Sequence, residues 1–311
     1  MTATVLSHLP AGLLRPLEEQ YPEIEIHVVP EEGAVPRDLR GEVLLTQAWG
    51  SPNLAEVLAR GVRWVHAFGT GVNDFPFEAL GGVPLTCSRG ASAVPIAEWV
   101  LAMILAAEKQ LPEAWIEAPP ERWNTTRFLG GLAGRTLGIV GLGGIGQAVA
   151  RRALAFDMEV LGLRRRDAAP PISGVERVSD LATLIAGSDH LVIAAPATRE
   201  TRHLIDESAL AHARPHLHIV NVSRGALVHQ DALRRALDED RVALASLDVV
   251  EPEPLPAGHW LYDHPRVRLS PHISWSGPGA LEELLVPFTR NLGHFLKAEP
   301  LEDLVDLELG Y

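Results

Sequence analysis

The chain has 311 residues, of which 47% are hydrophobic and 22% charged, and its formal net charge at pH 7 is −13. This length is natural for two domains, and the composition is that of an ordinary globular protein. The negative charge argues against nucleic acid or an anionic membrane as the main partner. A single cysteine, Cys87, excludes an intramolecular disulfide framework. Residues 1–8 contain no signal peptide and no apolar run reaches about 18 residues, so we expect a soluble, cytoplasmic protein.

The first 92 residues alternate short apolar runs with helical patterns, and Pro and Gly punctuate the connections. No phosphate-binding fingerprint occurs among them. The pattern predicts a small α/β unit with one clear helix at 54–59. Its expected strands are 4–6, 24–29, 43–45 and 64–65.

Residues 93–108 form a long apolar segment with helical spacing. Val94, Ala97, Leu101 and Ile104 share one face, and Pro95 suits the first turn of a helix. Because this helix is so apolar, we expect it to be buried, either between the domains or in a subunit interface.

A glycine pattern follows the apolar run 137–140 and precedes a helix-like segment at 147–150. Gly141, Gly143 and Gly146 form G-x-G-x-x-G, and the flanking strand and helix distinguish it from an ordinary Gly-rich turn. Gly141 permits the tight turn, Gly143 lets backbone approach a pyrophosphate, and Gly146 allows close strand–helix packing. The helix N-terminus then holds the phosphates. The sequence therefore predicts a Rossmann-type dinucleotide site.

The next apolar run, 158–163, ends in three arginines at 164, 165 and 166. An NAD site usually carries Asp or Glu here to accept from the ribose 2′-hydroxyl, whereas guanidinium groups bind a 2′-phosphate. Arg164 stands where the acid is expected. We therefore predict NADP(H) as the preferred cofactor and NAD(H) as a second one; the alternative is a solvated basic turn.

Between residues 136 and 270, apolar runs alternate with helical patterns, which is typical of a parallel sheet covered on both faces. His212, His216 and His218 fall around a turn in this region, and we expect them to be solvated rather than metal-bound. After Pro278 an amphipathic helix, about 280–297, leads to a polar tail. The expected strands are 137–140, 159–163, 190–194, 218–222, 242–248 and 267–270.

Three polar residues follow the later strands, where open parallel sheets place ligands. A guanidinium such as Arg224 can bind and polarise a 2-oxo acid, and His272 can protonate its carbonyl oxygen as hydride arrives. A carboxylate such as Glu253 favours the imidazolium and orients it. Taken singly, an Arg here is more often a salt-bridge partner, a His a surface residue and a Glu a loop residue.

These three residues lie in three of five motifs by which the chain resembles the D-isomer-specific 2-hydroxyacid dehydrogenase family over nearly its whole length. The resemblance implies an α/β fold of two doubly wound parallel-sheet, Rossmann-like domains. A cofactor domain, 93–278, would be inserted into a flavodoxin-like substrate-binding domain, 1–92 with 279–311. It also implies a homodimer built on the cofactor domain. The motifs are 66–73, 141–146, 221–228, 247–254 and 270–273.

The resemblance further implies catalytic roles. Arg224 would bind the substrate carboxylate and carbonyl, and His272 would be the general acid with Glu253 as its partner. Glu251 lies in the same loop, but the spacing favours Glu253. Asp248 would hold the nicotinamide carboxamide. With the two arginines, the expected cofactor-binding set is Gly141, Gly143, Gly144, Ile145, Gly146, Arg164, Arg165, Pro196, Val222, Ser223 and Asp248.

On the substrate side, the resemblance implies that backbone N–H groups of Gly69, Thr70, Gly71 and Val72 face the substrate carboxylate. Two tryptophans, Trp49 and Trp275, are candidates for lining the pocket, or are core or interface aromatics. No metal is expected.

The arginines at 164 and 165 favour the glyoxylate/hydroxypyruvate reductase-like branch of the family. The predicted function is NADPH-linked reduction of small 2-oxo acids to D-2-hydroxy acids. One alternative is a dinucleotide-sensing binding protein like the corepressors that share this scaffold. Another is oxidation of formate or phosphite on the same scaffold.

Overall fold

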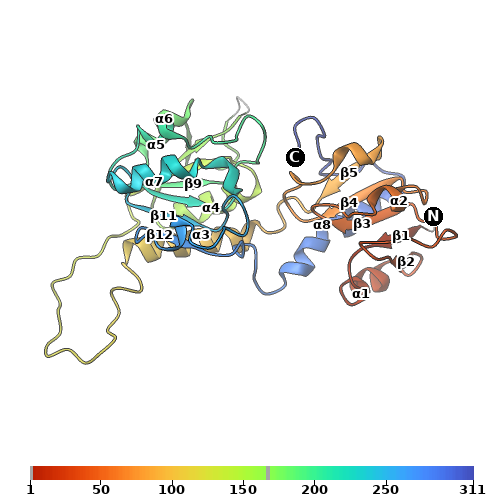
Figure 1. The fold of residues 1–311 in the computed structure, drawn as a ribbon, viewed down its shortest axis with the longest axis horizontal. Coiled ribbons are helices and arrows are strands. Elements are labelled where there is room, and N and C mark those ends of the chain that lie inside the picture. Colours follow the sequence, from red (N-terminus) through yellow and green to blue (C-terminus); the bar gives the residue numbers. More distant parts are fainter. Residues whose placement is uncertain (1–2, 166–168) are drawn as a thin grey trace. The chain divides into compact units, whose positions relative to one another are not determined.

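The computed structural model describes residues 3–165 and 169–311. They form two compact units, Met1–Ser92 with Gly277–Tyr311, and Ala93–Ser276. The second unit is thus inserted into the chain of the first. In Figure 1 the first unit carries both ends of the colour range, and the second carries the colours between, from gold through green to light blue. The return to the first unit begins at Gly277, two residues before the expected position.

The first unit contains a five-stranded sheet in the order β2-β1-β3-β4-β5, with all strands parallel. Alternate strand residues face opposite sides, so Val5 and Trp64 pack with α1 and α8, while Leu6 and Val65 pack on the other side with α2. Trp64 stacks on Phe288 of α8 with ring centroids 5.3 Å apart, which attaches the returning helix. The elements are β1 Thr4–Ser7, α1 Ala11–Gln20, β2 Glu25–Val28, β3 Val43–Gln47, α2 Leu54–Leu58, β4 Trp64–Phe68, the 3-10 helix Phe77–Leu80, β5 Leu85–Cys87 and α8 Ala280–Leu296.

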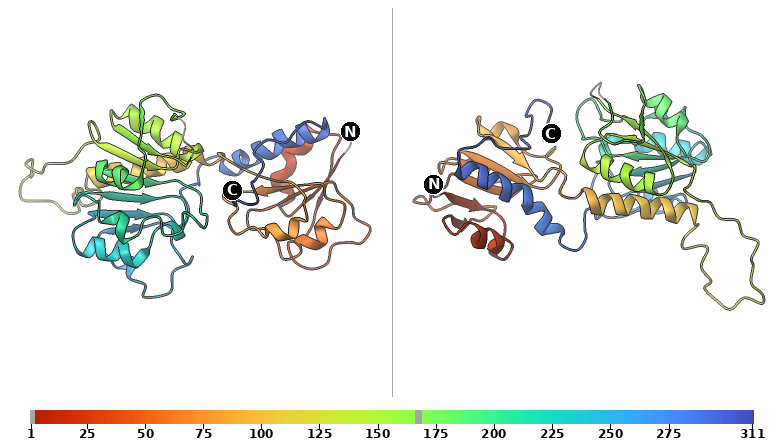
Figure 2. Two further views of the ribbon diagram at one scale, coloured as in Figure 1. Left: turned by 90° about the horizontal axis from the view of Figure 1, so that it is seen from above. Right: turned by 180° about the vertical axis from the view of Figure 1, so that it is seen from behind.

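The second unit contains a seven-stranded parallel sheet in the order β12-β11-β10-β9-β6-β7-β8. Its strand order reverses between β6 and β9, which is the switch point of a Rossmann sheet. Helices cover both faces, with α3 and α4 on one and α5, α6 and α7 on the other (Figure 2). The elements are α3 Ala93–Glu108, β6 Thr136–Val140, α4 Gly144–Ala155, β7 Glu159–Leu163, β8 Val175–Arg177, α5 Leu181–Gly187, β9 His190–Ile193, α6 Glu207–Leu210, β10 His218–Asn221, the 3-10 helix Gly225–Leu227, α7 Gln230–Asp238, β11 Leu244–Leu247, the 3-10 helix Trp260–Tyr262 and β12 Val267–Leu269.

The predicted fold class is confirmed, since both units are α/β with parallel sheets covered on two faces. The long helix over 93–108 is present as α3, and its buried face packs against α4 within the second unit. The expectation for His218 was wrong. It is buried in β10, where its Nε2 lies 2.9 Å from the Ser246 hydroxyl. No helix in the described part of the chain is long and apolar enough to cross a membrane.

Candidate active site

The candidate site occupies one edge of the second unit's sheet. All seven strands are parallel, so their carboxyl ends share an edge and the loops that follow them lie side by side. Each of six neighbouring strands is followed by a residue that the sequence singled out. In sheet order these are His272 after β12, Asp248 after β11, Arg224 after β10, Pro196 after β9, Gly141 after β6 and Arg164 after β7.

The phosphate turn is built by close backbone approach. Gly141 has a φ of 96°, and a Cβ there would lie 2.8 Å from the carbonyl oxygen of Ala194. A Cβ at Gly146 would lie 2.0 Å from the carbonyl oxygen of Gly141. Only glycine allows α4 to start this close to β6.

Gly143 and Gly144 face open space at the start of α4. Gly143 is the N-cap residue, and a Cβ there would meet no atom of the protein within 4 Å. The turn therefore leaves an uncovered cradle at the helix N-terminus, where free N–H groups and the helix dipole favour phosphate. Ile145 packs its side chain against the apolar core below. These residues fit a dinucleotide pyrophosphate.

The arginines at the end of β7 lie on the surface. Arg164 as a residue is half-buried, and its guanidinium donates from Nη1 to the carbonyl oxygen of Ala169 at 2.9 Å. Arg165 is exposed. The pKa of Glu200 is lowered first by a hydrogen bond from the backbone of Glu200 and then by one from Thr198, with smaller contributions from the positive charges of Arg199 and Arg165. The third arginine of the run, Arg166, lies outside the described residues.

His272 and Glu253 form the central pair of the site. Nδ1 of His272 lies 2.9 Å from Oε2 of Glu253, while Oε1 of Glu253 accepts from the backbone N–H of Val250 at 3.0 Å. Burial raises the pKa of Glu253, but the hydrogen bonds from His272 and Val250 and the positive charge of Arg224 outweigh it and lower the pKa overall. The pair thus holds an ionised carboxylate against the imidazole.

Arg224 is held by the turn that follows β10. The buried Asn221 accepts from the backbone N–H of Ser223 at 3.1 Å and donates to the carbonyl oxygen of Arg224 at 2.9 Å. The Ser223 hydroxyl donates to the carbonyl oxygen of Ala195, and Val222 is buried beside it. The Arg224 guanidinium donates from Nη1 to the Ser223 carbonyl oxygen at 2.7 Å. These bonds fix the backbone from which the guanidinium extends.

Asp248 is almost completely buried and braces the loop that carries His272. One carboxylate oxygen accepts from the hydroxyl of Ser270 at 2.5 Å and from the N–H of Ile273 at 2.9 Å. The other accepts from the N–H of Ser274 at 2.9 Å, and the Asp248 carbonyl oxygen accepts from the N–H of His272 at 2.9 Å. A contact from Asp248 to a nicotinamide carboxamide stays a prediction.

Trp275 also belongs to the His272 loop. Its ring packs against the apolar core beneath α3 and α4, and its Nε1 donates to the carbonyl oxygen of His272 at 3.0 Å. The side chain is partly buried against that core, and a role in lining the substrate pocket stays a prediction.

The candidates of the first unit follow β3 and β4 at the carboxyl edge of that unit's own sheet. Trp49 is 62% exposed. In the segment after β4, Gly69, Thr70 and Gly71 are half-buried and Val72 is buried in the core. The Thr70 hydroxyl donates to the carbonyl oxygen of Ser88 at 3.1 Å, which fixes the turn.

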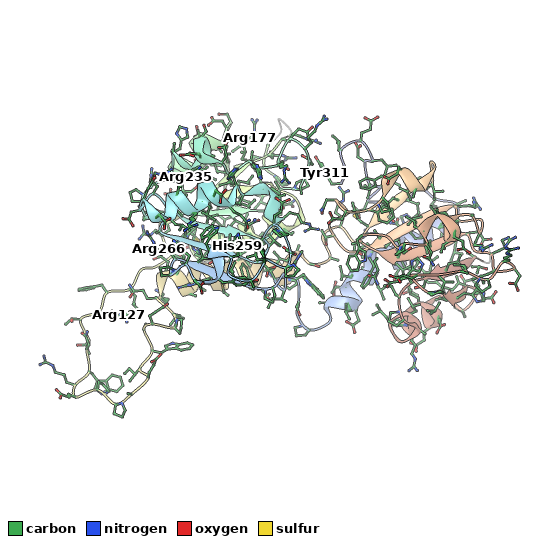
Figure 3. All side chains as sticks on the ribbon, in the orientation of Figure 1. Arg127, Arg177, Arg235, His259, Arg266 and Tyr311 are labelled. Atoms are coloured by element: carbon green, nitrogen blue, oxygen red, sulfur yellow. The ribbon has the colours of Figure 1, made fainter. Side chains whose placement is uncertain are left out.

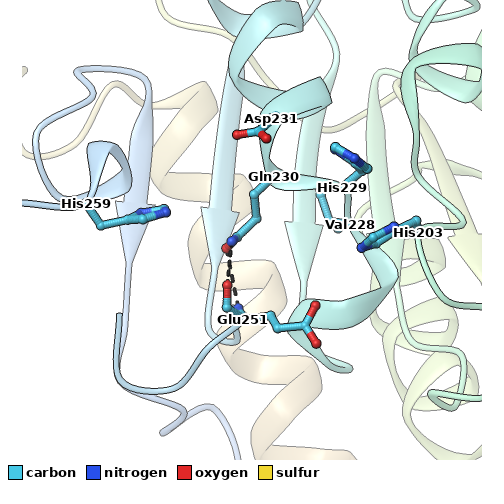
Figure 4. A pocket seen from close by; sticks show the side chains of 7 residues that line it. All are labelled: His203, Val228, His229, Gln230, Asp231, Glu251 and His259. Carbon is cyan, nitrogen blue, oxygen red and sulfur yellow. Dashed lines mark hydrogen bonds between the residues drawn. The ribbon is translucent and has the colours of Figure 1, made fainter. Parts of the chain in front are cut away.

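A pocket of about 220 Å³ is lined in part by Glu251 and contains none of the candidate catalytic residues. Glu251, on its wall, pairs with both terminal nitrogens of Arg202 at 2.9 and 3.1 Å. Gln230 donates to the carbonyl oxygen of Glu251 at 2.5 Å and accepts from its N–H at 3.4 Å (Figure 4). The pocket thus lies beside the contacts of Arg202 and Gln230 that hold Glu251 in place. The sequence indicated neither Arg202 nor Gln230, because no local motif marks these residues.

Comparison with known proteins identifies the family. Residues 101–274 match the family described as D-isomer specific 2-hydroxyacid dehydrogenase, NAD binding domain. A glyoxylate reductase of Thermofilum pendens is 35% identical over 83% of this chain and 77% of its own, and one of Thermococcus litoralis is 36% identical over 73% and 71%. A D-3-phosphoglycerate dehydrogenase of Methanocaldococcus jannaschii is 33% identical over 77% of this chain but only 46% of its own.

A solved structure of an NADPH-dependent glyoxylate/hydroxypyruvate reductase from Sinorhizobium meliloti, in complex with NADP and sulfate, superposes with a TM-score of 0.81. The two chains are 25% identical, and the match covers 99% of this chain and 100% of the other. The chain described here belongs to the D-isomer-specific 2-hydroxyacid dehydrogenase family, in its glyoxylate reductase branch, and is a nicotinamide-dinucleotide-binding 2-hydroxyacid dehydrogenase.

Proposed function

We propose that this protein is an NADPH-preferring reductase of small 2-oxo acids, glyoxylate, hydroxypyruvate or a close relative, to D-2-hydroxy acids. The observation that carries the proposal is the His272–Glu253 pair at 2.9 Å, within the electrostatic reach of Arg224 and on the same sheet edge as the phosphate turn. The glyoxylate reductases among the relatives support the substrate class.

The residues divide the work by their chemistry. Arg224 binds the substrate carboxylate with two parallel N–H donors and polarises the 2-oxo group. A reduced nicotinamide, when bound, supplies the hydride. His272 donates a proton to the carbonyl oxygen, and Glu253 stabilises the imidazolium and keeps the ring in one orientation. Oxidation of the hydroxy acid reverses these roles.

The preference for NADPH rests on the end of β7. Arg164 follows Leu163 directly, at the position where NAD sites carry an acid, and Arg165 adds a second exposed guanidinium. Two solved relatives, each 25% identical to this chain, hold NADPH or NADP.

We also propose a homodimer built on the cofactor unit. The long connection from α3 to β6 extends away from the rest of its unit (Figure 3, where Arg127 marks it) and presents large apolar side chains to solvent. Phe128 is 91% exposed and Trp123 75%. Its two ends are tied together, since Lys109 donates from Nζ to the Gly130 carbonyl oxygen at 2.6 Å. A second copy of the chain would cover this surface. Light scattering should give twice the 33.7 kDa chain mass, and a monomer would contradict the proposal.

The cytoplasmic location stays a prediction.

The deciding experiment is an NADPH-oxidation screen across 2-oxo acids of increasing side-chain size, repeated with NADH. We expect turnover of the smallest acids and a lower KM for NADPH, and Arg164→Asp should shift the preference toward NADH. His272→Ala should lose most of kcat, and Arg224→Ala should raise the substrate KM strongly. Tight cofactor binding with no turnover of any 2-oxo acid would instead favour a dinucleotide-sensing binding protein.

A further inference from the structure

The backbone of His272 has an unusual conformation. Its φ is +55°, in the left-handed region that non-glycine residues rarely occupy and that persists only when surrounding contacts enforce it. Two hydrogen bonds hold the backbone of this residue, one at its N–H group and one at its carbonyl oxygen. Its N–H donates to the carbonyl oxygen of Asp248 at 2.9 Å, and its carbonyl oxygen accepts from the indole of Trp275 at 3.0 Å.

Trp275 lies one residue before the end of the second unit, close to where the chain returns to the first. The unit ends at Ser276, and residues 276–279 are exposed. Because the indole ring packs against the apolar core of its own unit, the position of its N–H is fixed by that core rather than by the connecting segment. The Trp275 side chain is therefore the last anchor between the histidine and the connection to the other unit.

We propose that Trp275 is a positioning residue for the reaction. Its indole N–H holds the carbonyl group of His272 in place, and this keeps the imidazole ring aligned with Glu253. The segment that follows Trp275 is not needed for this alignment. The proposal rests on the proposed function for its catalytic consequence. It also assigns the open role of Trp275. The ring is partly buried against the core and its donor is used within the loop, so in this proposal the tryptophan acts on the histidine and not by stacking on a substrate.

Trp275→Phe is the direct test, because it keeps an aromatic ring in the core and removes the donor. We expect kcat for 2-oxo acid reduction to fall about 10-fold or more, since a small misplacement of a catalytic group is costly, while the KM values for acid and NADPH stay within about twofold. Trp260→Phe is the matched control. The indole Nε1 of Trp260 is buried with no hydrogen-bond partner among the described residues, and its loss should leave kcat unchanged.

A spectroscopic readout tests the same claim without turnover. The ¹⁵N chemical shifts of a histidine ring report which nitrogen carries the proton. In the wild-type protein Nδ1 of His272 should carry it, facing Glu253; in Trp275→Phe the two tautomers should mix. If the phenylalanine variant does not fold, β-(3-benzothienyl)alanine at position 275 removes only the N–H and should give the same two effects.

The outcomes separate cleanly. A variant with unchanged kcat and unchanged ring shifts would overturn the proposal, and so would a raised substrate KM at constant kcat, which would mean that the indole touches substrate. If the wild-type protein reduces no 2-oxo acid, the proposed function fails. The ring shifts still decide whether Trp275 positions His272.

Discussion

At the scale of single residues, the direction of the Glu253–His272 contact decides which nitrogen does chemistry. Glu253 faces Nδ1 of His272, and an ionised carboxylate only accepts hydrogen bonds, so Nδ1 carries a proton. The nitrogen left to exchange a proton with substrate is therefore Nε2. The second carboxylate oxygen accepts from the Val250 N–H, which stops the carboxylate from rotating away.

A pH profile follows from this pair. In reduction the substrate takes its proton from His272, while Glu253 stays ionised beside the ring. At low pH the profile should fall only below the ordinary carboxyl range, because the contacts of Glu253 lower its pKa. In Glu253→Gln the partner has no charge. We expect the acid limb to disappear and kcat at pH 7 to fall about 10-fold or more.

The measurement is kcat/KM for reduction from about pH 3 to pH 9 at saturating NADPH, and Glu251→Gln is its control. Glu251 is two residues away in the same loop but pairs with Arg202 instead of the histidine. Its profile should keep the wild-type shape. Equal profiles for the wild type and Glu253→Gln would show that the carboxylate plays no part in the titration.

The residues with chemistry in this site could be predicted because each stands at a fixed place in a local motif. Their supports could not. The carboxylate of Asp248 reaches Ser274, 26 positions along the chain, and Gln230 reaches Glu251, 21 positions away. Such bonds depend on which strands become neighbours in the sheet. Asn221 is different, because its bond to the N–H two residues on is a local Asx turn that the sequence Asn-Val-Ser could have suggested.

At the scale of elements, the apolar content of a run decided most of what the sequence revealed. Buried runs of four or five residues, such as β3, β6 and β10, are clear from it. We did not expect β5 and β8, which have three residues each, although β12 is as short and was expected at 267–270. The helix α1 was also missed, since it contains Pro16, a residue that usually ends a helix.

The turn before α4 offers two alanine substitutions with opposite expected effects. Gly146→Ala pushes a methyl group into the carbonyl of Gly141, so the turn must move, and we expect a stability loss of about 1–3 kcal/mol. Gly143→Ala meets nothing in the protein and should unfold like the wild type. Its methyl group would instead occupy the space of the pyrophosphate, and the Kd for NADPH should rise about 10-fold.

Thermal unfolding without cofactor and a fluorescence titration with NADPH measure these two quantities separately. Wild-type affinity in Gly143→Ala would place the cofactor phosphates elsewhere. Wild-type stability in Gly146→Ala would mean that the helix can shift without cost.

At the scale of the whole molecule, the first unit is closed by a helix that the chain supplies only after the second unit. The contacts that attach α8 are therefore long in sequence. One of them runs through a buried histidine of β4, His66, whose Nδ1 lies 2.7 Å from the hydroxyl of Thr86 and whose Nε2 lies 3.2 Å from that of Ser88. The Ser88 hydroxyl in turn donates to the carbonyl oxygen of Leu284 in α8 at 2.7 Å. A neutral imidazole thus links the middle of the sheet to the returning helix.

This linkage predicts an acid-sensitive first unit. Burial lowers the pKa of His66 to about 3, whereas in the unfolded chain the pKa of an imidazole is about 6.5. The unfolded state therefore binds the extra proton first. The stability that neutral His66 contributes is complete above pH ~6.5 and declines as the pH falls from there toward 3, by about 1.4 kcal/mol per pH unit.

His66→Gln lacks this titration, although it should be less stable at neutral pH because its bonds to Thr86 and Ser88 change. Between pH 7.5 and 5 the wild type should thus lose about 2 kcal/mol more unfolding free energy than the variant, measured by urea unfolding followed by circular dichroism. Carboxylates and the other buried histidines contribute equally to both proteins and cancel in the difference. Parallel losses in the two proteins would mean that His66 is protonated, or reaches water, in the folded state.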